Sequence, residues 1–187
     1  MSKPKILSSK VMFEGQVVKV RVEKILKENG HRTTREIVEH SPAVAVVAVD
    51  AERNILLVEQ YREAVKQELL EIPAGGIDPG EDLETAVKRE MQEETGFLPQ
   101  KLIKLYGFYA APGYDTEFMH IYLAAELTPS RLIAEDTEEI RLVKVPVNEI
   151  PDLLISGRLI DAKTIAGLYA FLDYEKRNIN PETIRFH

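Results

Sequence analysis

A run of apolar residues, AVAVVAVD from Ala43 to Asp50, constrains the fold more than any other segment. The run is rich in valine and does not alternate with polar residues, which is typical of a strand buried on both faces. A polar turn, AERN, separates it from a second strand-like segment, ILLVEQYR, which begins at Ile55. We expect these two strands in the main core.

The residues before this run show a different, alternating pattern. VVKVRVEKIL places Val18, Val20 and Val22 on one side, and a turn-like ENGH follows before TTREIVEH resumes the alternation. We therefore expect a small antiparallel β-sheet over residues 1–41. Pro42 marks the boundary, because proline removes a backbone donor and favours an extended residue before it.

Three later segments have the pattern of strands, and two have the pattern of helices. The strand candidates are KLIKLYGFYA, FMHIYLAAEL and IRLVKVPV, and the helix candidates are PVNEIPDLLISGR and DAKTIAGLYAFLDYEKR. The stretch LTPSRLIAEDTEE is a long acidic loop, and such loops are more often functional than decorative. Residues 42–187 are thus predicted to form one main domain, and the fold class is α+β.

The composition argues against several classes of protein. A net charge of −7 over 187 residues disfavours general binding to nucleic acid, because the phosphate backbone would be repelled. Residues 1–40 differ, with nine Lys and Arg against five Glu, and are either an anion site or a set of solvated strand faces. Cysteine is absent, the start lacks an apolar signal core, and no apolar run could span a bilayer. We expect a cytoplasmic protein without a membrane partner.

The segment DLETAVKREMQEET, Asp82–Thr95, is predicted to form one α-helix, since a DPGE turn precedes it and Gly96 follows it. At about 100° per residue, four apolar residues form one stripe along it. They are Leu83, Ala86, Val87 and Met91. Glu90 and Glu94 fall inside this stripe as an i, i+4 pair, and Glu93 lies at its margin.

Three carboxylates at the edge of a core require a counter-charge. They repel one another and resist desolvation, at a cost on the order of several kcal/mol each. Arg89 offers one positive charge and does not offset three negative ones. A hard divalent cation is the simplest solution, and magnesium or manganese suits oxygen ligands better than zinc. The alternative is a solvated acidic pair on an ordinary surface helix.

The full segment, GGIDPGEDLETAVKREMQEETGF, resembles the Nudix box, G-x5-E-x7-R-E-U-x-E-E-x-G-U, in which U is apolar. Every specified position is in register: Gly75, Glu81, Arg89, Glu90, Met91, Glu93, Glu94, Gly96 and Phe97. The resemblance implies an α/β/α sandwich with a mixed sheet, here preceded by the small antiparallel sheet. It also implies a divalent metal on the glutamates, hydrolysis of a nucleoside-diphosphate derivative, and an Arg89 that supports catalysis by orienting a glutamate.

The flanking segments resemble one subfamily, the ADP-ribose pyrophosphatases. The similar segments are EQYREAVKQELLEIPAGGID before the box, TREIVEH in the first forty residues, and Pro112-Gly113 after the box. This resemblance implies that Arg62 contacts a phosphate, which suits its planar fork of donors. It also implies that Arg35 and Glu36 bind the adenosine end, although a cross-strand ion pair is an equal alternative for Glu36.

The same resemblance supplies the metal ligands and the group that activates water. Glu90, Glu94 and the backbone carbonyl of Ala74 are expected on the metal ions, with Glu93 close enough to share the catalytic work. In the acidic loop, Glu138 is the candidate that orients or deprotonates the attacking water, and a merely solvated loop is the alternative. Its rivals are Glu135, Asp136 and Glu139.

The expected reaction is hydrolysis of ADP-ribose to AMP and ribose 5-phosphate, with Mg²⁺ required and Mn²⁺ as a substitute. Two alternatives stay open: another nucleoside-diphosphate derivative, such as GDP-mannose, ADP-glucose or a reduced dinucleotide, or a module that senses a nucleotide without cleaving it. The subfamily resemblance further implies a homodimer in which the N-terminal sheet reaches over the partner's active site.

Overall fold

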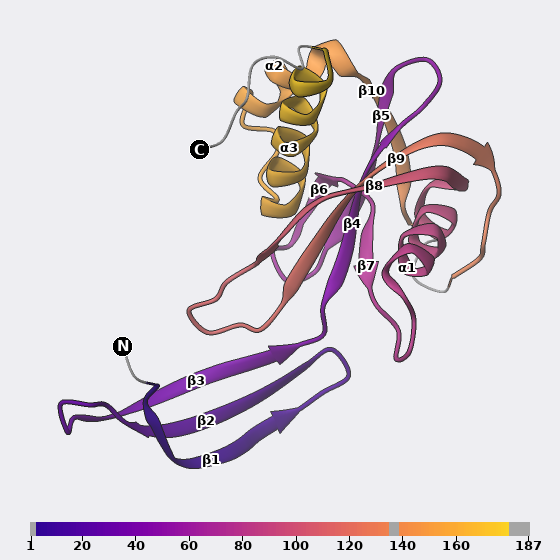
Figure 1. The fold of residues 1–187 in the computed structure, drawn as a ribbon. Coiled ribbons are helices and arrows are strands. Elements are labelled where there is room, and N and C mark those ends of the chain that lie inside the picture. The colour runs from indigo at the N-terminus through magenta and orange to yellow at the C-terminus, as the bar shows by residue number, and fades with distance from the viewer. Residues whose placement is uncertain (1–2, 135–138, 180–187) are drawn as a thin grey trace. The chain divides into compact units, whose positions relative to one another are not determined.

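The computed structural model describes residues 3–134 and 139–179. The chain divides into two compact units (Figure 1). The first contains Met1–Pro42 and Phe108–Met119, and the second contains Ala43–Gly107 and His120–His187. The sequence predicted domains over residues 1–41 and 42–187, with residues 108–119 in the second. Among the described residues, no helix combines the length and the apolar character needed to cross a bilayer.

The first unit is built on a three-stranded antiparallel sheet in the order β1-β2-β3. The strands are β1 (Lys5–Glu14), β2 (Val18–Leu26) and β3 (Arg32–His40). Phe108–Met119 joins this unit by backbone pairing with β3: Val38 N–H donates to the Tyr114 carbonyl at 2.7 Å, and Thr116 N–H donates to the Val38 carbonyl at 3.0 Å. More than seventy residues separate these partners, so local sequence patterns did not reveal the pairing.

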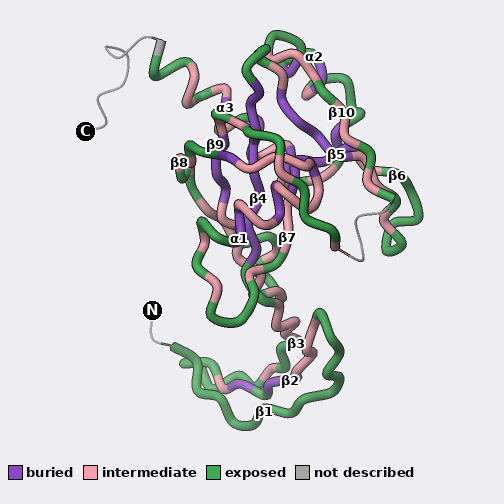
Figure 2. Tube along the Cα trace, turned by 90° about the vertical axis from the view of Figure 1, so that its right-hand side faces the viewer, coloured by how far each residue is buried: buried purple, intermediate pink, exposed green. Residues whose placement is uncertain are grey.

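The second unit contains a seven-stranded sheet with the main path β10-β5-β4-β9-β8, to which β6 adds on β5 and β7 adds on β4. The strands are β4 (Ala43–Val49), β5 (Asn54–Arg62), β6 (Gln67–Glu71), β7 (Ala74–Gly76), β8 (Phe97–Tyr109), β9 (Phe118–Pro129) and β10 (Arg141–Pro146). Every residue of β4 is buried, so the prediction of a strand covered on both faces is confirmed (Figure 2).

Helices cover the two faces of β4. The helical segments of the second unit are α1 (Leu83–Glu90), the π-helical turn η1 (Met91–Thr95), the 3-10 turn η3 (Val147–Glu149), α2 (Ile150–Ile155) and α3 (Ala162–Ile179). Figure 1 shows α1 on one side of the sheet and α3 on the other. Alternate residues of β4 follow this division: Val44 and Val46 belong to the α1 core, whereas Val47 lies against Gly167 of α3.

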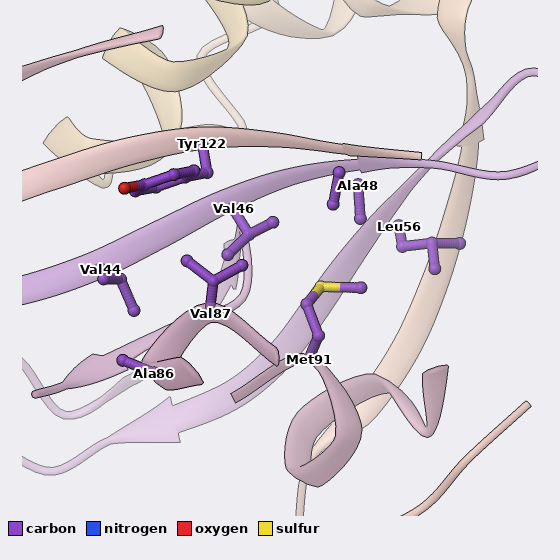
Figure 3. Close-up of a cluster of buried hydrophobic side chains, with 9 residues drawn as sticks. Val44, Val46, Ala48, Leu56, Ala86, Val87, Met91 and Tyr122 are labelled. Atoms are coloured by element: carbon purple, nitrogen blue, oxygen red, sulfur yellow. The ribbon is translucent and has the colours of Figure 1, made fainter. Parts of the chain in front are cut away.

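The apolar stripe of the helix packs as the sequence predicts. Ala86, Val87 and Met91 are fully buried in a cluster with Val44 and Val46, as Figure 3 shows, and Leu83 packs against this cluster. The helix begins at its cap, Asp82, whose carboxylate accepts the backbone N–H groups of Glu84 and Thr85 at 3.1 Å. The cap and the stripe together fix the rotation of α1 on the sheet.

The final turn of this helix differs from the prediction. The sequence predicts α-helix through Thr95, but Met91–Thr95 is π-helical, and Gly96 N–H donates to the Met91 carbonyl across five residues. The Thr95 hydroxyl donates to the same carbonyl at 2.5 Å, and Gly96 adopts a left-handed conformation with φ 77°. The wider turn changes the phase of Glu93 and Glu94 from that of a regular helix.

Candidate active site

Glu90 is held against the backbone of β7. Only 7% of this residue is exposed. A Cβ atom added at Gly75 would lie 2.1 Å from the Glu90 carboxylate, so only glycine leaves room for it. Burial raises the pKa of Glu90, and the neighbouring Arg89 opposes this rise. The motif therefore needs glycine at position 75, because a side chain there would occupy the space of the Glu90 carboxylate.

Arg89 binds three glutamates and one backbone carbonyl. Its Nε and Nη2 donate to the two carboxylate oxygens of Glu81, both at 3.0 Å. Its Nη1 donates to Glu90 at 2.6 Å and to Glu93 at 3.2 Å, and its Nη2 also donates to the Gly76 carbonyl at 2.8 Å. Arg89 thus holds carboxylates of the loop and of the helix in place. A guanidinium suits this role because it can donate several hydrogen bonds in a fixed geometry.

Glu94 has much less compensation for its charge. Its carboxylate accepts one hydrogen bond, from Ala74 N–H at 3.0 Å, and forms no ion pair with any residue that the structure describes. Burial raises the pKa of Glu94 to about 8, and the nearby Glu90 carboxylate adds to this rise. Among the described residues, Glu94 therefore has no ion pair, and the more distant charges of Arg62 and Lys163 only partly oppose the rise of its pKa.

The residues present fit a hard divalent cation. All the side-chain donors are carboxylate oxygens, and Arg89 supplies the one positive charge that is hydrogen-bonded to them. Within residues 3–134 and 139–179, no three carboxylates or imidazoles converge closely enough to hold a metal ion. Glu90 and Glu93 are both ion-paired with Arg89.

Arg62 is engaged with an acidic residue that the sequence reasoning missed. Its Nε and Nη2 donate to the two oxygens of Glu71 at 2.9 and 2.7 Å, and Lys163 is also ion-paired with Glu71. Glu71 is only 1% exposed. A glutamate within the apolar stretch LLEIP was the available signal, because a buried carboxylate needs a partner.

Four expected substrate-binding residues belong to the first unit, whereas the glutamates and Arg62 belong to the second. Arg35 and Glu36 are exposed on β3, and Arg35 donates to the Thr34 carbonyl at 3.0 Å. Pro112 and Gly113 are exposed in the turn of Phe108–Met119. Within the second unit, Arg89 is hydrogen-bonded to Glu90 and Glu93, and Ala74 N–H to Glu94.

The acidic loop is anchored next to the π-helical turn. Ser130 N–H donates to the Gly96 carbonyl at 2.9 Å, and the Gln92 side-chain amide donates to the Ser130 hydroxyl at 2.8 Å. Glu139 is exposed in a turn before β10. The other three carboxylates expected here lie outside the described residues: Glu135, Asp136 and Glu138.

A sheet covered by helices on both faces, with glutamates on a loop–helix–loop at its edge, defines a class of hydrolases that act on phosphorus anhydrides. The chain belongs to the Nudix family, since residues 39–168 match the model described as NUDIX domain. Nudix hydrolases generally need a divalent metal ion. The resemblance read from Gly75 to Phe97 is confirmed.

Several known proteins are similar over most of their length. An ADP-ribose pyrophosphatase of Bacillus subtilis (strain 168) is 38% identical over 163 residues, which are 86% of this chain and 88% of that protein. A methanol dehydrogenase activator of Bacillus methanolicus is 35% identical over 166 residues, 88% of this chain and 90% of that protein. The crystal structure of an ADP compounds hydrolase has a TM-score of 0.88 at 26% identity and covers 95% of this chain and 97% of its own. This neighbour confirms the Nudix fold with a mixed sheet.

Proposed function

We propose that this Nudix hydrolase cleaves ADP-ribose into AMP and ribose 5-phosphate. One observation carries the proposal: Glu94, whose pKa burial raises to about 8, lies beside the buried Glu90 with a single backbone donor. Two neighbouring carboxylates, of which only Glu90 has an ion pair among the described residues, suit a site that binds metal ions together with an anionic substrate. The similarity to an ADP-ribose pyrophosphatase supports the choice of substrate.

In this proposal, Glu90, Glu94 and the backbone carbonyl of Ala74 hold the metal ions, and Glu93 shares the work. Mg²⁺ is the proposed metal, with Mn²⁺ as a substitute, because every donor is a hard oxygen. When bound, the metal lowers the pKa of a water and cancels charge on the diphosphate. Arg89 keeps Glu90 and Glu93 in place, as its hydrogen bonds of 2.6 and 3.2 Å indicate.

The remaining roles follow the chemistry of each group. Arg62 binds a phosphate with the face of its guanidinium that Glu71 leaves open, since 39% of its side chain is exposed. Glu138 acts as the base that takes a proton from the attacking water, and its loop follows β9 and is hydrogen-bonded at Ser130 to Gly96 and Gln92, next to the π-helical turn. Arg35 and Glu36 contact the adenosine end. Pro112-Gly113 lines the substrate.

We propose that two copies of the chain associate through β1. Each residue of β1 is exposed within its unit, and β1 is the edge strand of its sheet (Figure 2). Its large apolar residues, Ile6, Leu7, Val11, Met12 and Phe13, are 41% to 57% exposed. An apolar edge strand is an aggregation hazard unless a partner covers it. Sedimentation should show a dimer, and a monomer with full activity would contradict this.

A cytoplasmic location is part of the same proposal. The sequence contains no cysteine, which is compatible with a reducing compartment and a soluble substrate. Fractionation of cells that express the chain at its natural level should place it with the soluble contents. Recovery outside the cell would contradict the location without affecting the proposed chemistry.

The test is a panel of nucleoside-diphosphate derivatives with Mg²⁺, in which products are identified by mass and oxygen-labelled water marks the phosphorus attacked. We expect AMP and ribose 5-phosphate from ADP-ribose at the highest kcat/KM. Faster cleavage of GDP-mannose, ADP-glucose or a reduced dinucleotide would overturn the substrate and keep the reaction class. The name of the Bacillus methanolicus relative supports a second candidate function, activation of a partner enzyme. This function would be the remaining candidate if no compound in the panel were cleaved.

A further inference from the structure

A cluster of four charged side chains joins α3 to the strands beside the glutamates. We call it the α3 charge cluster, and its members are Arg62, Glu71, Asp161 and Lys163. Arg62 grips Glu71 with two N–H groups at 2.9 and 2.7 Å, and Lys163 binds both Glu71 and Asp161, the latter at 3.0 Å. Asp161 and Lys163 lie outside the Nudix box, and the sequence assigned them no role.

The exposed fraction of the side chains in the cluster increases from Glu71 to Lys163 to Arg62. The Glu71 side chain is 2% exposed, that of Lys163 is 16% exposed and that of Arg62 is 39% exposed. Two acids, Glu71 and Asp161, therefore meet two cations, and the more exposed cation is Arg62. The charges of Arg62 and Lys163 also oppose the rise of the Glu94 pKa, which places both cations near the proposed metal ligands.

The first turn of α3 is fixed to the segment that leads into β7. The Asp161 carboxylate accepts Thr164 N–H at 2.9 Å, as a helix cap does. The Thr164 hydroxyl in turn accepts Ile72 N–H at 2.9 Å, and Thr164 is fully buried. Ile72 lies two residues before Ala74. The backbone that carries Lys163 is thus held in place by hydrogen bonds on both sides of Thr164.

We propose that Lys163 is a positioning residue for the diphosphate of the substrate, acting through Glu71 and Arg62. Its ammonium group pairs with Glu71 and Asp161 and keeps the cluster neutral, so the exposed guanidinium of Arg62 can attract an anion at the solvent side. Without Lys163, Glu71 would balance Arg62 alone, and the exposed guanidinium would attract phosphate more weakly. The inference rests on the proposed function for the location of the diphosphate.

The first test compares Lys163→Met, which keeps the apolar stem, with Lys163→Arg, which keeps the charge. For Lys163→Met we expect KM to rise about tenfold and kcat to stay within about twofold, because substrate binding loses a charge effect. Lys163→Arg should keep KM within about threefold of the unmodified protein. Lys176→Met, at an exposed lysine of the same helix, is the matched control. An unchanged KM in a folded Lys163→Met protein would overturn the proposal.

A double-mutant cycle separates positioning from simple stabilisation. In an Arg62→Met background, Lys163→Met should raise KM no further, because Lys163 acts through Arg62. Independent, multiplying effects on KM would overturn the proposal.

The substrate in both assays is whichever compound the unmodified protein cleaves, so a wrong choice of ADP-ribose leaves the test intact. Calorimetric titration of ADP into the metal-free protein gives a second readout. Weaker ADP binding in Lys163→Met than in Lys176→Met supports the inference, and equal binding contradicts it. If the unmodified protein cleaves no compound, the proposed function fails, and the ADP titration alone decides the role of Lys163.

Discussion

The two regions that flank β7 treat buried carboxylates in opposite ways. In the α3 charge cluster, the acids Glu71 and Asp161 meet the cations Arg62 and Lys163, and these cations hold the pKa of Glu71 below its ordinary value despite burial. On the helix side, Glu81, Glu90 and Glu93 share Arg89, and the one hydrogen bond that Glu94 accepts from the described residues comes from a backbone N–H. With two acids and two cations, the α3 charge cluster requires no added cation. The unbalanced one creates the demand for a divalent cation.

The largest effect that distinguishes the two regions is expected from Glu94→Gln. Loss of the charge of a proposed metal ligand should lower kcat/KM by about a thousandfold or more, which is several kcal/mol of transition-state stabilisation. The metal-free variant should be at least as stable as the unmodified protein, because an uncompensated carboxylate is removed. Steady-state kinetics and thermal melts measure both. Glu84→Gln, at an exposed position of the same helix, is the control, and equal activity in the two variants would refute the assignment.

The second prediction concerns stability against pH in the absence of metal. The folded pKa of Glu94 is raised from 4.5 to about 8, so the folded state binds more protons than the unfolded state between these values. Stability should therefore fall as pH rises from about 4.5 to about 8, by an amount on the order of several kcal/mol. Glu71, whose pKa is lowered, contributes stability that is lost only as pH falls below its ordinary range. Urea midpoints across this range measure the slope, which Glu94→Gln should flatten.

The helix side was predictable from sequence because its partners are local. Glu81, Arg89, Glu90 and Glu93 lie within thirteen consecutive positions, so helix periodicity and the motif spacing bring them together. The contact between Glu71 and Lys163 spans 92 positions, and only the tertiary fold creates it. The pairing of Val38 with Tyr114 escaped the sequence for the same reason.

The π-helical turn was missed for a different reason. A 100° wheel assumes a regular helix, whereas Thr95 and Gly96 both use the Met91 carbonyl and widen the turn. The main strands were read correctly because continuous or alternating apolar patterns are strong signals.

The third prediction is a loss of stability, whereas the first expects none from the removal of the Glu94 charge. Glu71→Gln leaves Arg62 and Lys163 facing each other without the buried charge that joins them, which should destabilise the fold by about 3 kcal/mol. Thermal and urea unfolding of the variant give this cost. Glu68→Gln, at an exposed position of the same strand, provides the comparison. If the Glu71→Gln protein were as stable as the Glu94→Gln protein, the claim that cations stabilise the Glu71 carboxylate and not the Glu94 carboxylate would be wrong.

The smallest effect is expected at Thr95. Its hydroxyl donates to the Met91 carbonyl, so Thr95→Val should cost about 1 kcal/mol of stability. The turn should also shift toward regular helix, lowering kcat several-fold by moving Glu94. Thr95→Ser keeps the hydroxyl and should retain both values, which kinetics and melting of the paired variants can check. Equal behaviour of the two variants would remove the hydroxyl from the account.

The central claim is that the uncompensated Glu94 site requires a divalent cation. Calorimetric titration of Mg²⁺ at pH 7, repeated in buffers of different ionisation enthalpy, counts the protons that metal binding releases. Because the folded pKa of Glu94 is about 8, binding should release about one proton per site in the unmodified protein. In Glu94→Gln this release should be lost and the binding weakened. Metal binding without proton release, or the same release in both proteins, would contradict the claim.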